Sequence, residues 1–162
     1  MIIGITGHRP GKLGWGYNYE HPKWIKVKNI VKEYLKNWGC KEVWVGMALG
    51  FDIVVALAVL ELKDEGYNIK LNCAVPCRNH YSKWPKKSID MCNSIMEKAD
   101  SVVLVTDEDY SPHLMQKRNM YIVDKCSKLL ALWNGSAGGT GNCLIYAWNQ
   151  AKDVSIIDPN EI

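Results

Sequence analysis

Two patterns of apolar and polar positions, one typical of strands and one of helices, alternate regularly along the chain. Short apolar runs predict strands over Ile2–Thr6, Glu42–Val45, Ile69–Val75, Ser101–Val105, Leu129–Trp133 and Val154–Ile157. Between them, helical periodicity predicts helices over Pro22–Trp38, Phe51–Glu65, Ser82–Ala99, Leu114–Lys125 and Cys143–Ala151. The first helix illustrates the pattern, because Val27, Val31, Leu35 and Trp38 fall on one of its faces.

Regular alternation of strands and helices is typical of an α/β fold. The strands are largely apolar, so we expect a doubly wound, Rossmann-like, mainly parallel sheet flanked by helices on both faces. The helix Phe51–Glu65 is apolar almost all round and should be buried on most sides. No linker, repeat or low-complexity tract interrupts the pattern, which predicts a single domain over residues 1–162.

Composition excludes several classes of protein. Hydrophobic residues make up 48% and charged residues 23% of the 162 residues, an ordinary globular balance that argues against disorder. The longest apolar run, Ile53–Leu60, is far shorter than the roughly 20 residues that span a membrane. The segment after Met1 has no charged region of a signal peptide. We therefore expect no membrane contact and a cytoplasmic location.

The cysteines and histidines do not follow the spacing of a metal site or of a disulfide framework. The six cysteines are scattered without any Cys-x-x-Cys pair, and the four histidines do not pair with them at zinc-finger spacing. We expect reduced thiols, no metal and no resident cofactor.

The charge balance is mild. Twenty Lys and Arg residues against 17 Asp and Glu residues give a net charge of +3, which argues against a dedicated nucleic-acid-binding protein. One row of lysines on the first long helix is either a solvated face or an anion-attracting surface: Lys23, Lys26, Lys28, Lys32 and Lys36.

Unusual residues gather in the loops that follow the predicted strands. Ligands of doubly wound sheets bind beyond the carboxyl ends of the strands, where the strand order reverses. Two of these loops, Gly46–Gly50 and Gly138–Gly141, are rich in glycine and lead into helices. A helix N-terminus offers unpaired N–H groups and a positive dipole end, and glycine lets an anion approach. We expect phosphates at the helix starts near Gly50 and Thr140.

Side chains in the same loops could complete an anion site. Arg9, Arg78 and Arg118 are candidate bidentate phosphate donors. Neither glycine loop is a P-loop or a complete G-x-G-x-x-G motif, so a kinase or NTPase has no support. Taken alone, Gly46–Gly50 could also be a tight turn, Gly138–Gly141 could be a flexible loop, and Arg9 could be a surface residue.

Several individual residues leave alternatives open. Asp52 is a helix cap or dipole partner, a ribose hydroxyl acceptor, or a general acid or base, and the helix dipole should favour its ionised form. For His8 we expect a local hydrogen-bonding role. Four aromatic residues either stack on a base or fill the core of a chain with one phenylalanine: Trp15, Tyr17, Tyr81 and Trp84.

The loop motifs, taken in order, resemble the YpsA-like branch of the SLOG superfamily, which is bacterial or phage-borne. The resemblance covers nearly the whole chain and rests on Ile5-Thr6-Gly7-His8-Arg9-Pro10, Gly46-x-Ala48-x-Gly50-Phe51-Asp52, Pro76, Trp84, Tyr110-Ser111-Pro112, Lys117-Arg118-Asn119 and the Gly-Gly-Thr140 loop. It implies a Rossmann-like domain that binds nucleotides or nucleotide-derived ligands. The superfamily also contains LOG phosphoribohydrolases and DprA-like DNA-processing domains.

The chain departs from the LOG enzymes at two positions. Those enzymes carry an Arg-Lys pair followed by a Gly-Gly-x-Gly-Thr-x-x-Glu loop, whereas here Asn119 follows Arg118, and Cys143, Leu144 and Ile145 follow the loop in place of the motif's glutamate. Cleavage of an N-glycosidic bond needs a nearby carboxylate. Asp52 is the first substitute for that carboxylate, with Asp107, Glu108 and Asp109 as weaker candidates.

The sequence thus predicts a protein that binds a small nucleotide-like ligand, as a sensor or a sequestering protein, with nucleic acid disfavoured as a partner and a homodimer left open. The alternatives are a nucleosidase or phosphoribohydrolase-like enzyme and a DprA-like DNA-binding protein. In the enzyme hypothesis, Asp52 and Arg118 are catalytic. The expected ligand-binding residues are Gly7, His8, Arg9, Pro10, Gly46, Ala48, Gly50, Asp52, Pro76, Arg78, Trp84, Asn119, Gly138, Gly139, Thr140 and Asn142.

Overall fold

The computed structural model describes all residues from Met1 to Ile162 and contains one six-stranded sheet. The strands are β1 (Ile2–Gly7), β2 (Glu42–Val45), β3 (Lys70–Val75), β4 (Ser101–Leu104), β5 (Lys128–Leu132) and β6 (Asp153–Ile157). Their spatial order is β4-β3-β2-β1-β5-β6, and every neighbouring pair is parallel. The expected Rossmann-like α/β fold is confirmed.

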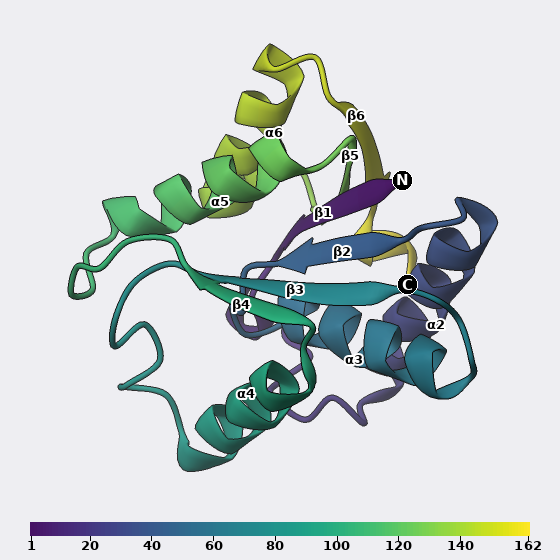
Figure 1. Ribbon diagram of the computed structural model, residues 1–162, viewed down its shortest axis with the longest axis horizontal. Coiled ribbons are helices and arrows are strands. Elements are labelled where there is room, and N and C mark those ends of the chain that lie inside the picture. Colours follow the sequence, from purple (N-terminus) through teal and green to yellow (C-terminus); the bar gives the residue numbers. More distant parts are fainter.

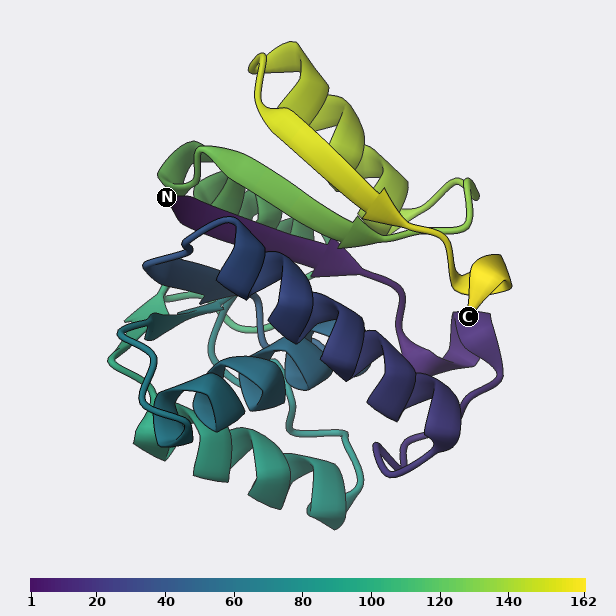
Figure 2. The same cartoon turned by 90° about the vertical axis from the view of Figure 1, so that its right-hand side faces the viewer.

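Helices cover both faces of the sheet (Figures 1 and 2). One face carries α2 (Pro22–Asn37), α3 (Phe51–Asp64) and α4 (Lys86–Lys98), and the other carries α5 (His113–Lys125) and α6 (Gly139–Asn149). No helix is long and apolar enough to span a membrane.

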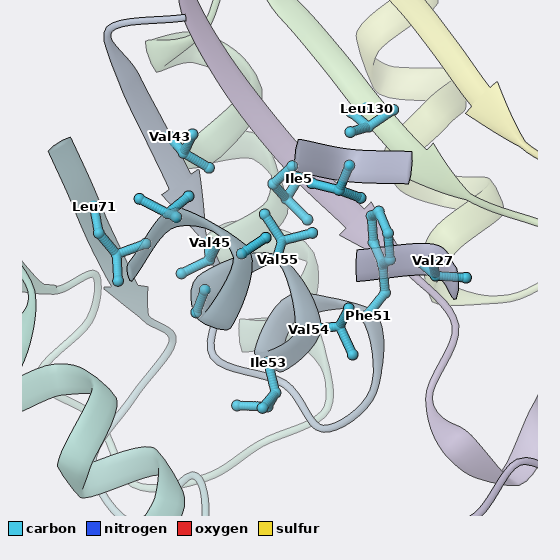
Figure 3. Packing of buried hydrophobic residues seen from close by; sticks show 14 of the residues in the cluster. Ile5, Val27, Val43, Val45, Phe51, Ile53, Val54, Val55, Leu71 and Leu130 are labelled. Atoms are coloured by element: carbon cyan, nitrogen blue, oxygen red, sulfur yellow. The ribbon is translucent and has the colours of Figure 1, made fainter. Parts of the chain in front are cut away.

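The two faces hold cores of different size. The cluster beneath α2 and α3 contains 28 buried residues, including Ile5, Val27 and Phe51 (Figure 3). The cluster that joins α6 to β5 contains six, among them Leu129 and Leu144. Since α3 carries nine buried residues, its expected burial is confirmed. Most of the hydrophobic stabilisation therefore lies on the α2–α3 face.

Several predicted boundaries are wrong, each for a local reason. The fourth helix begins at Lys86 rather than Ser82, because Pro85 caps it in an extended conformation. The last helix begins at Gly139 rather than Cys143, so the glycine-rich loop supplies its first turn. Two short elements were not predicted, namely α1 (Pro10–Leu13) and a 3-10 turn over Pro159–Glu161. Both begin with proline at the first helical position and are too short to show periodicity.

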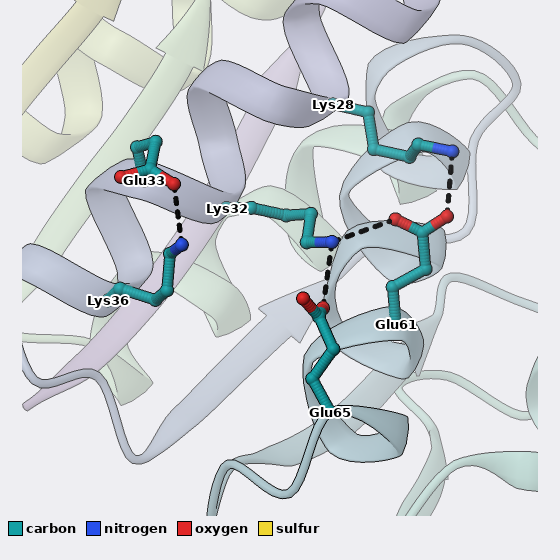
Figure 4. A network of polar contacts seen from close by, with 6 residues as sticks. All are labelled: Lys28, Lys32, Glu33, Lys36, Glu61 and Glu65. Carbon is teal, nitrogen blue, oxygen red and sulfur yellow. Dashed lines mark hydrogen bonds and ion pairs between the residues drawn. The ribbon is translucent and has the colours of Figure 1, made fainter.

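The lysine row of α2 faces acidic residues of α3. Lys28 and Lys32 both pair with Glu61, at 2.9 and 3.4 Å, and Lys32 also pairs with Glu65 at 2.8 Å (Figure 4). These contacts place much of the row's charge next to carboxylates, which supports the solvated-face interpretation over an anion-attracting surface.

The six cysteines are all buried, and none forms a disulfide. Burial raises the pKa of Cys73 and of Cys92 to about 12, so these thiols stay protonated at neutral pH.

Candidate functional site

A cavity of about 260 Å³ opens at the carboxyl end of β1, where the starts of α3 and α6 and one side of α5 meet. The chain builds the sheet outward from β1 to β4 on one side and from β5 to β6 on the other, so β1 and β5 flank the point where strand order reverses. We call this space the switch-point cavity. It is lined by Ile5, Thr6, Gly7, His8, Arg9, Lys12, Ala48, Asp52, Met115, Arg118, Asn119, Gly138, Gly139 and Thr140.

One wall of the switch-point cavity is the first turn of α6. The N–H groups of Gly139, Thr140 and Gly141 donate to no protein atom, and no side chain caps this helix. The dipole of an eleven-residue helix adds positive potential at the same point. This wall can therefore accept an anionic group such as a phosphate.

Two arginines line the switch-point cavity and differ in exposure. Arg9 is exposed, whereas Arg118 is only 5% exposed. The Arg118 guanidinium donates through Nε to Asn119 Oδ1 at 2.9 Å and through Nη1 to the Gly46 carbonyl, while Nη2 has no protein partner. Arg118 is thus fixed in one orientation with a donor to spare for a ligand.

Gly46 makes the position of Arg118 possible. A Cβ atom at residue 46 would lie 2.7 Å from the Arg118 guanidinium. Gly46 itself is buried and does not line the cavity. The glycine that the sequence suggested as a ligand contact therefore makes room for the arginine instead.

Asp52 is the only carboxylate that lines the switch-point cavity. It is 5% exposed, and its Oδ2 accepts the Ala48 N–H at 3.2 Å. Burial raises the pKa of Asp52 above its ordinary value, although the positive charge of Arg118 acts in the opposite direction. Desolvation thus acts against the expectation that the helix dipole favours the ionised form of Asp52.

His8 connects the end of β1 to the loop after β5. The Asn134 N–H donates to His8 Nε2 at 3.1 Å, and burial lowers the pKa of His8, which favours the neutral ring. The structure thus gives His8 a hydrogen-bonding role, but its partner lies 126 residues away along the chain rather than locally, and His8 also lines the cavity.

Gly50, the other expected phosphate contact, lies outside the switch-point cavity. Its N–H donates to the Tyr19 hydroxyl at 2.9 Å, and the next N–H, of Phe51, donates to the His8 carbonyl at 3.3 Å. The Gly50 and Phe51 N–H groups are therefore satisfied within the protein, whereas the N–H groups of Asp52 and Ile53, like the first three of α6, donate to no protein atom.

The structure brings ten of the predicted residues to the switch-point cavity: Gly7, His8, Arg9, Ala48, Asp52, Arg118, Asn119, Gly138, Gly139 and Thr140. Trp84 lines a second cavity. The remaining predicted residues line neither, namely Pro10, Gly46, Gly50, Pro76, Arg78 and Asn142. Arg78, for example, pairs with Asp107 and Asp109 at 3.6 and 3.5 Å.

Sequence reasoning missed four residues that line the switch-point cavity, namely Ile5, Thr6, Lys12 and Met115. Lys12 Nζ donates to Ser136 Oγ at 3.3 Å and to the Ala137 carbonyl at 3.0 Å, beside the start of α6. The available clue was its place in the Gly-rich segment after β1, where α1 turns the chain back toward the cavity.

Comparison with known proteins gives a match to one family and several related bacterial proteins. Residues 3–160 match the model of the YspA SLOG family. A UPF0398 protein of Bacillus pumilus is 28% identical over 160 residues, covering 96% of this chain and 86% of the relative. An uncharacterized SPbeta prophage-derived protein, YoqJ, of Bacillus subtilis is 28% identical over 143 residues, covering 79% and 84%.

Two solved structures share the fold at low sequence identity. DNA processing protein A of Helicobacter pylori, described for its unique single-stranded DNA binding mode, gives a TM-score of 0.68 at 16% identity. DNA processing protein A of Streptococcus pneumoniae gives 0.66 at 14%. This chain is covered to 98% and 96%, but it spans only 65% and 50% of theirs. On the family match over nearly all of its length, this chain belongs to the YspA SLOG family.

Proposed function

We propose that this protein binds a nucleotide or nucleotide-derived ligand in the switch-point cavity and acts as a sensor or sequestering protein. The observation that carries the proposal is the first turn of α6, whose free N–H groups share one cavity with Arg9 and Arg118. Backbone donors, a helix dipole and two guanidinium groups form a combination suited to phosphate. A cytoplasmic location, where such ligands circulate, belongs to the same proposal.

The remaining wall of the cavity suits the sugar of such a ligand. Asp52 can accept a hydrogen bond from a ribose hydroxyl when ionised and can donate one when protonated. Arg118 Nη2 has no protein partner and can donate to a sugar or phosphate oxygen.

The test places a negative charge at the start of α6, where the helix dipole is positive. Gly139 has no atom within 4 Å of a Cβ position, so substitutions there leave the packing intact. Gly139→Asp should retain stability, because a carboxylate suits a helix N-terminus, yet it should repel phosphate. Gly139→Asn is the neutral control of similar size.

Binding of inorganic phosphate, ribose 5-phosphate, nucleoside monophosphates and ADP-ribose would be measured by calorimetry. We expect at least a tenfold loss of affinity in Gly139→Asp, about 1.4 kcal/mol or more relative to the wild type, and a much smaller loss in Gly139→Asn. Equal affinity for every phosphate probe in wild type and Gly139→Asp would overturn the proposed phosphate site.

A second candidate function is N-glycosidic hydrolysis, favoured by the position of Asp52 in the cavity. Asp107, Glu108 and Asp109 do not line it, so Asp52 is the carboxylate available for charge stabilisation or acid–base work. Incubation with nucleoside monophosphates, NAD and ADP-ribose tests for released base. We expect no release, or slow release that disappears in Asp52→Asn; fast release that persists in that variant would contradict both hypotheses.

DNA binding is a third candidate, favoured by the fold shared with a DNA processing protein described for single-stranded DNA binding. That likeness weakens the expectation that disfavours nucleic acid as a partner. The net charge of +3 and the pairing of Lys28 and Lys32 with Glu61 act against it. Fluorescence anisotropy with a single-stranded oligonucleotide would support DNA binding if the affinity fell steeply with salt concentration.

A further inference from the structure

A second and larger cavity, of about 590 Å³, adjoins the switch-point cavity through Arg9, which lines both. It lies over the loops that follow β3 and β4. We call it the aromatic cavity, and its walls are Arg9, Asn79, His80, Ser82, Lys83, Trp84, Asp109 and Tyr110.

The two loops that form the aromatic cavity are bonded to each other. The Arg78 N–H donates to the Glu108 carbonyl at 2.9 Å, and residues 78 and 109 form an isolated parallel bridge. Thr106 Oγ1 also donates to the Pro76 carbonyl at 3.0 Å. The pairing of β3 with β4 thus continues past the strands and holds the cavity walls together without a ligand.

Aromatic rings make up one part of the wall. The His80 ring stacks on Tyr81 at 4.6 Å between centroids and meets the Trp84 ring edge-on at 5.3 Å. The Tyr81 hydroxyl donates to Asn93 Oδ1 of α4 at 2.7 Å, which fixes that ring. Tyr110 comes from the other loop and is 56% exposed.

Neutral polar groups lie among these rings. Burial lowers the pKa of His80 to about 4, so its imidazole is uncharged at neutral pH, and its buried Nε2 has no hydrogen-bond partner. Asn79 and Ser82 add an amide and a hydroxyl. Aromatic faces with neutral donors and acceptors suit a planar heterocycle, and Arg9 at the junction suits a phosphate attached to it.

We infer that the aromatic cavity is the subsite for the heterocyclic base of a nucleotide whose phosphate binds at the start of α6. The inference rests on the proposed phosphate site and adds that the ligand must carry a heterocyclic base. Trp84 and Tyr110 provide the stacking surfaces, and Arg9 holds the part of the ligand that passes from one cavity to the other. The protein therefore selects nucleotides over phosphate esters that lack a base.

The test compares four nucleoside monophosphates with ribose 5-phosphate, which has the same phosphate and sugar but no base. In the wild type, at least one nucleotide should bind more tightly than ribose 5-phosphate. Tyr110→Ala and Trp84→Leu should each weaken that nucleotide by about 5- to 100-fold, the range expected for lost stacking. Affinity for ribose 5-phosphate should stay within about twofold in the Tyr110→Ala and Trp84→Leu variants.

Tyr17→Ala is the matched control, because Tyr17 is also 56% exposed and lines neither cavity. It should leave all affinities unchanged. Incorporation of 5-fluorotryptophan gives a direct readout, with the Trp84 resonance assigned through Trp84→Leu. That resonance should shift with the nucleotide and remain in place with ribose 5-phosphate.

Failure of the base subsite and failure of the phosphate site give different results. If ribose 5-phosphate binds as tightly as every nucleotide, or if Tyr110→Ala weakens both probes equally, the base subsite is overturned and the phosphate site stands. If no probe binds, the phosphate site is overturned as well. Tight binding of a short oligothymidine that Tyr110→Ala abolishes would also support the subsite. It would show that the base comes from a nucleic-acid strand rather than from a free nucleotide.

Discussion

The two glycine-rich loops, Gly46–Gly50 before α3 and Gly138–Gly141 before α6, both lead into helices but differ in how their glycines are packed. The N–H of Gly50 donates to Tyr19, and α3 enters the 28-residue core. The first N–H groups of α6 donate to no protein atom and line a cavity. The glycine-rich turn into α3 therefore serves tertiary packing, whereas the turn into α6 borders the cavity that we propose holds a phosphate.

The surroundings of each glycine explain this difference. At Gly50, φ is +95° and an added Cβ would lie 2.5 Å from the His8 carbonyl oxygen, so glycine is required by the backbone and by a close approach of two chain segments. At Gly139, an added Cβ would meet nothing within 4 Å. The fold does not need a glycine there, and the open space is available to a ligand.

The largest expected effect comes from alanine at these two positions. Gly50→Ala should lower the free energy of unfolding by about 3–5 kcal/mol, because it adds a strained φ and a steric clash. Gly139→Ala should leave it unchanged or raise it by less than about 1 kcal/mol. Urea unfolding of the two variants measures the difference; equal destabilisation would show that both loops serve packing.

Removal of the Tyr19 hydroxyl, which accepts the Gly50 N–H before α3, should have the next largest effect on the free energy of unfolding. Tyr19→Phe deletes the hydroxyl that accepts the Gly50 N–H, and a buried donor without a partner costs about 1–3 kcal/mol. Tyr17→Phe, two residues away at an exposed tyrosine, should cost nothing measurable. If both variants unfold at the same denaturant concentration as the wild type, Tyr19 does not satisfy the start of α3.

The sequence predicted the fold well because its information is local and repeated. The core positions Val27, Val31 and Leu35 recur over several turns and are all buried. The start of α6 was placed four residues late, because glycines that favour a loop in isolation are held in a helical turn by the packing of Leu144 and Cys143 against β5.

The site was predicted only in part for a different reason. Strand ends gave the correct edge of the sheet, so Arg9, Asp52 and Thr140 were found together. Sequence spacing does not show which backbone donors another segment satisfies, and Tyr19 lies 31 residues before Gly50. Lys12 was missed because a four-residue helix carries no periodic pattern.

The pH dependence of stability tests the buried carboxylate between the two loops. Burial raises the pKa of Asp52, so its contribution to stability is present below its unfolded pKa and is lost as pH rises through its folded pKa. Relative to Asp52→Asn, the wild type should therefore gain stability as pH falls from neutral toward 4. Chemical unfolding of both proteins across that range measures the difference; a relative loss of wild-type stability toward low pH would contradict a raised pKa.

The smallest expected effect comes from the lysine beside the start of α6. Lys12 holds Ser136 and Ala137 through exposed hydrogen bonds, so Lys12→Met should change the free energy of unfolding by less than about 1 kcal/mol. The same substitution removes a positive charge from the switch-point cavity and should weaken ribose 5-phosphate binding by a few-fold, about 1 kcal/mol or less. Lys26→Met, which removes an exposed lysine remote from the cavity, should change neither quantity.

Because Gly50→Ala should affect stability and Lys12→Met should affect binding, calorimetry and urea unfolding of these variants separate the two loops. A Lys12→Met protein that is destabilised by several kcal/mol would show that the α6 loop, like the α3 loop, is part of the packed core.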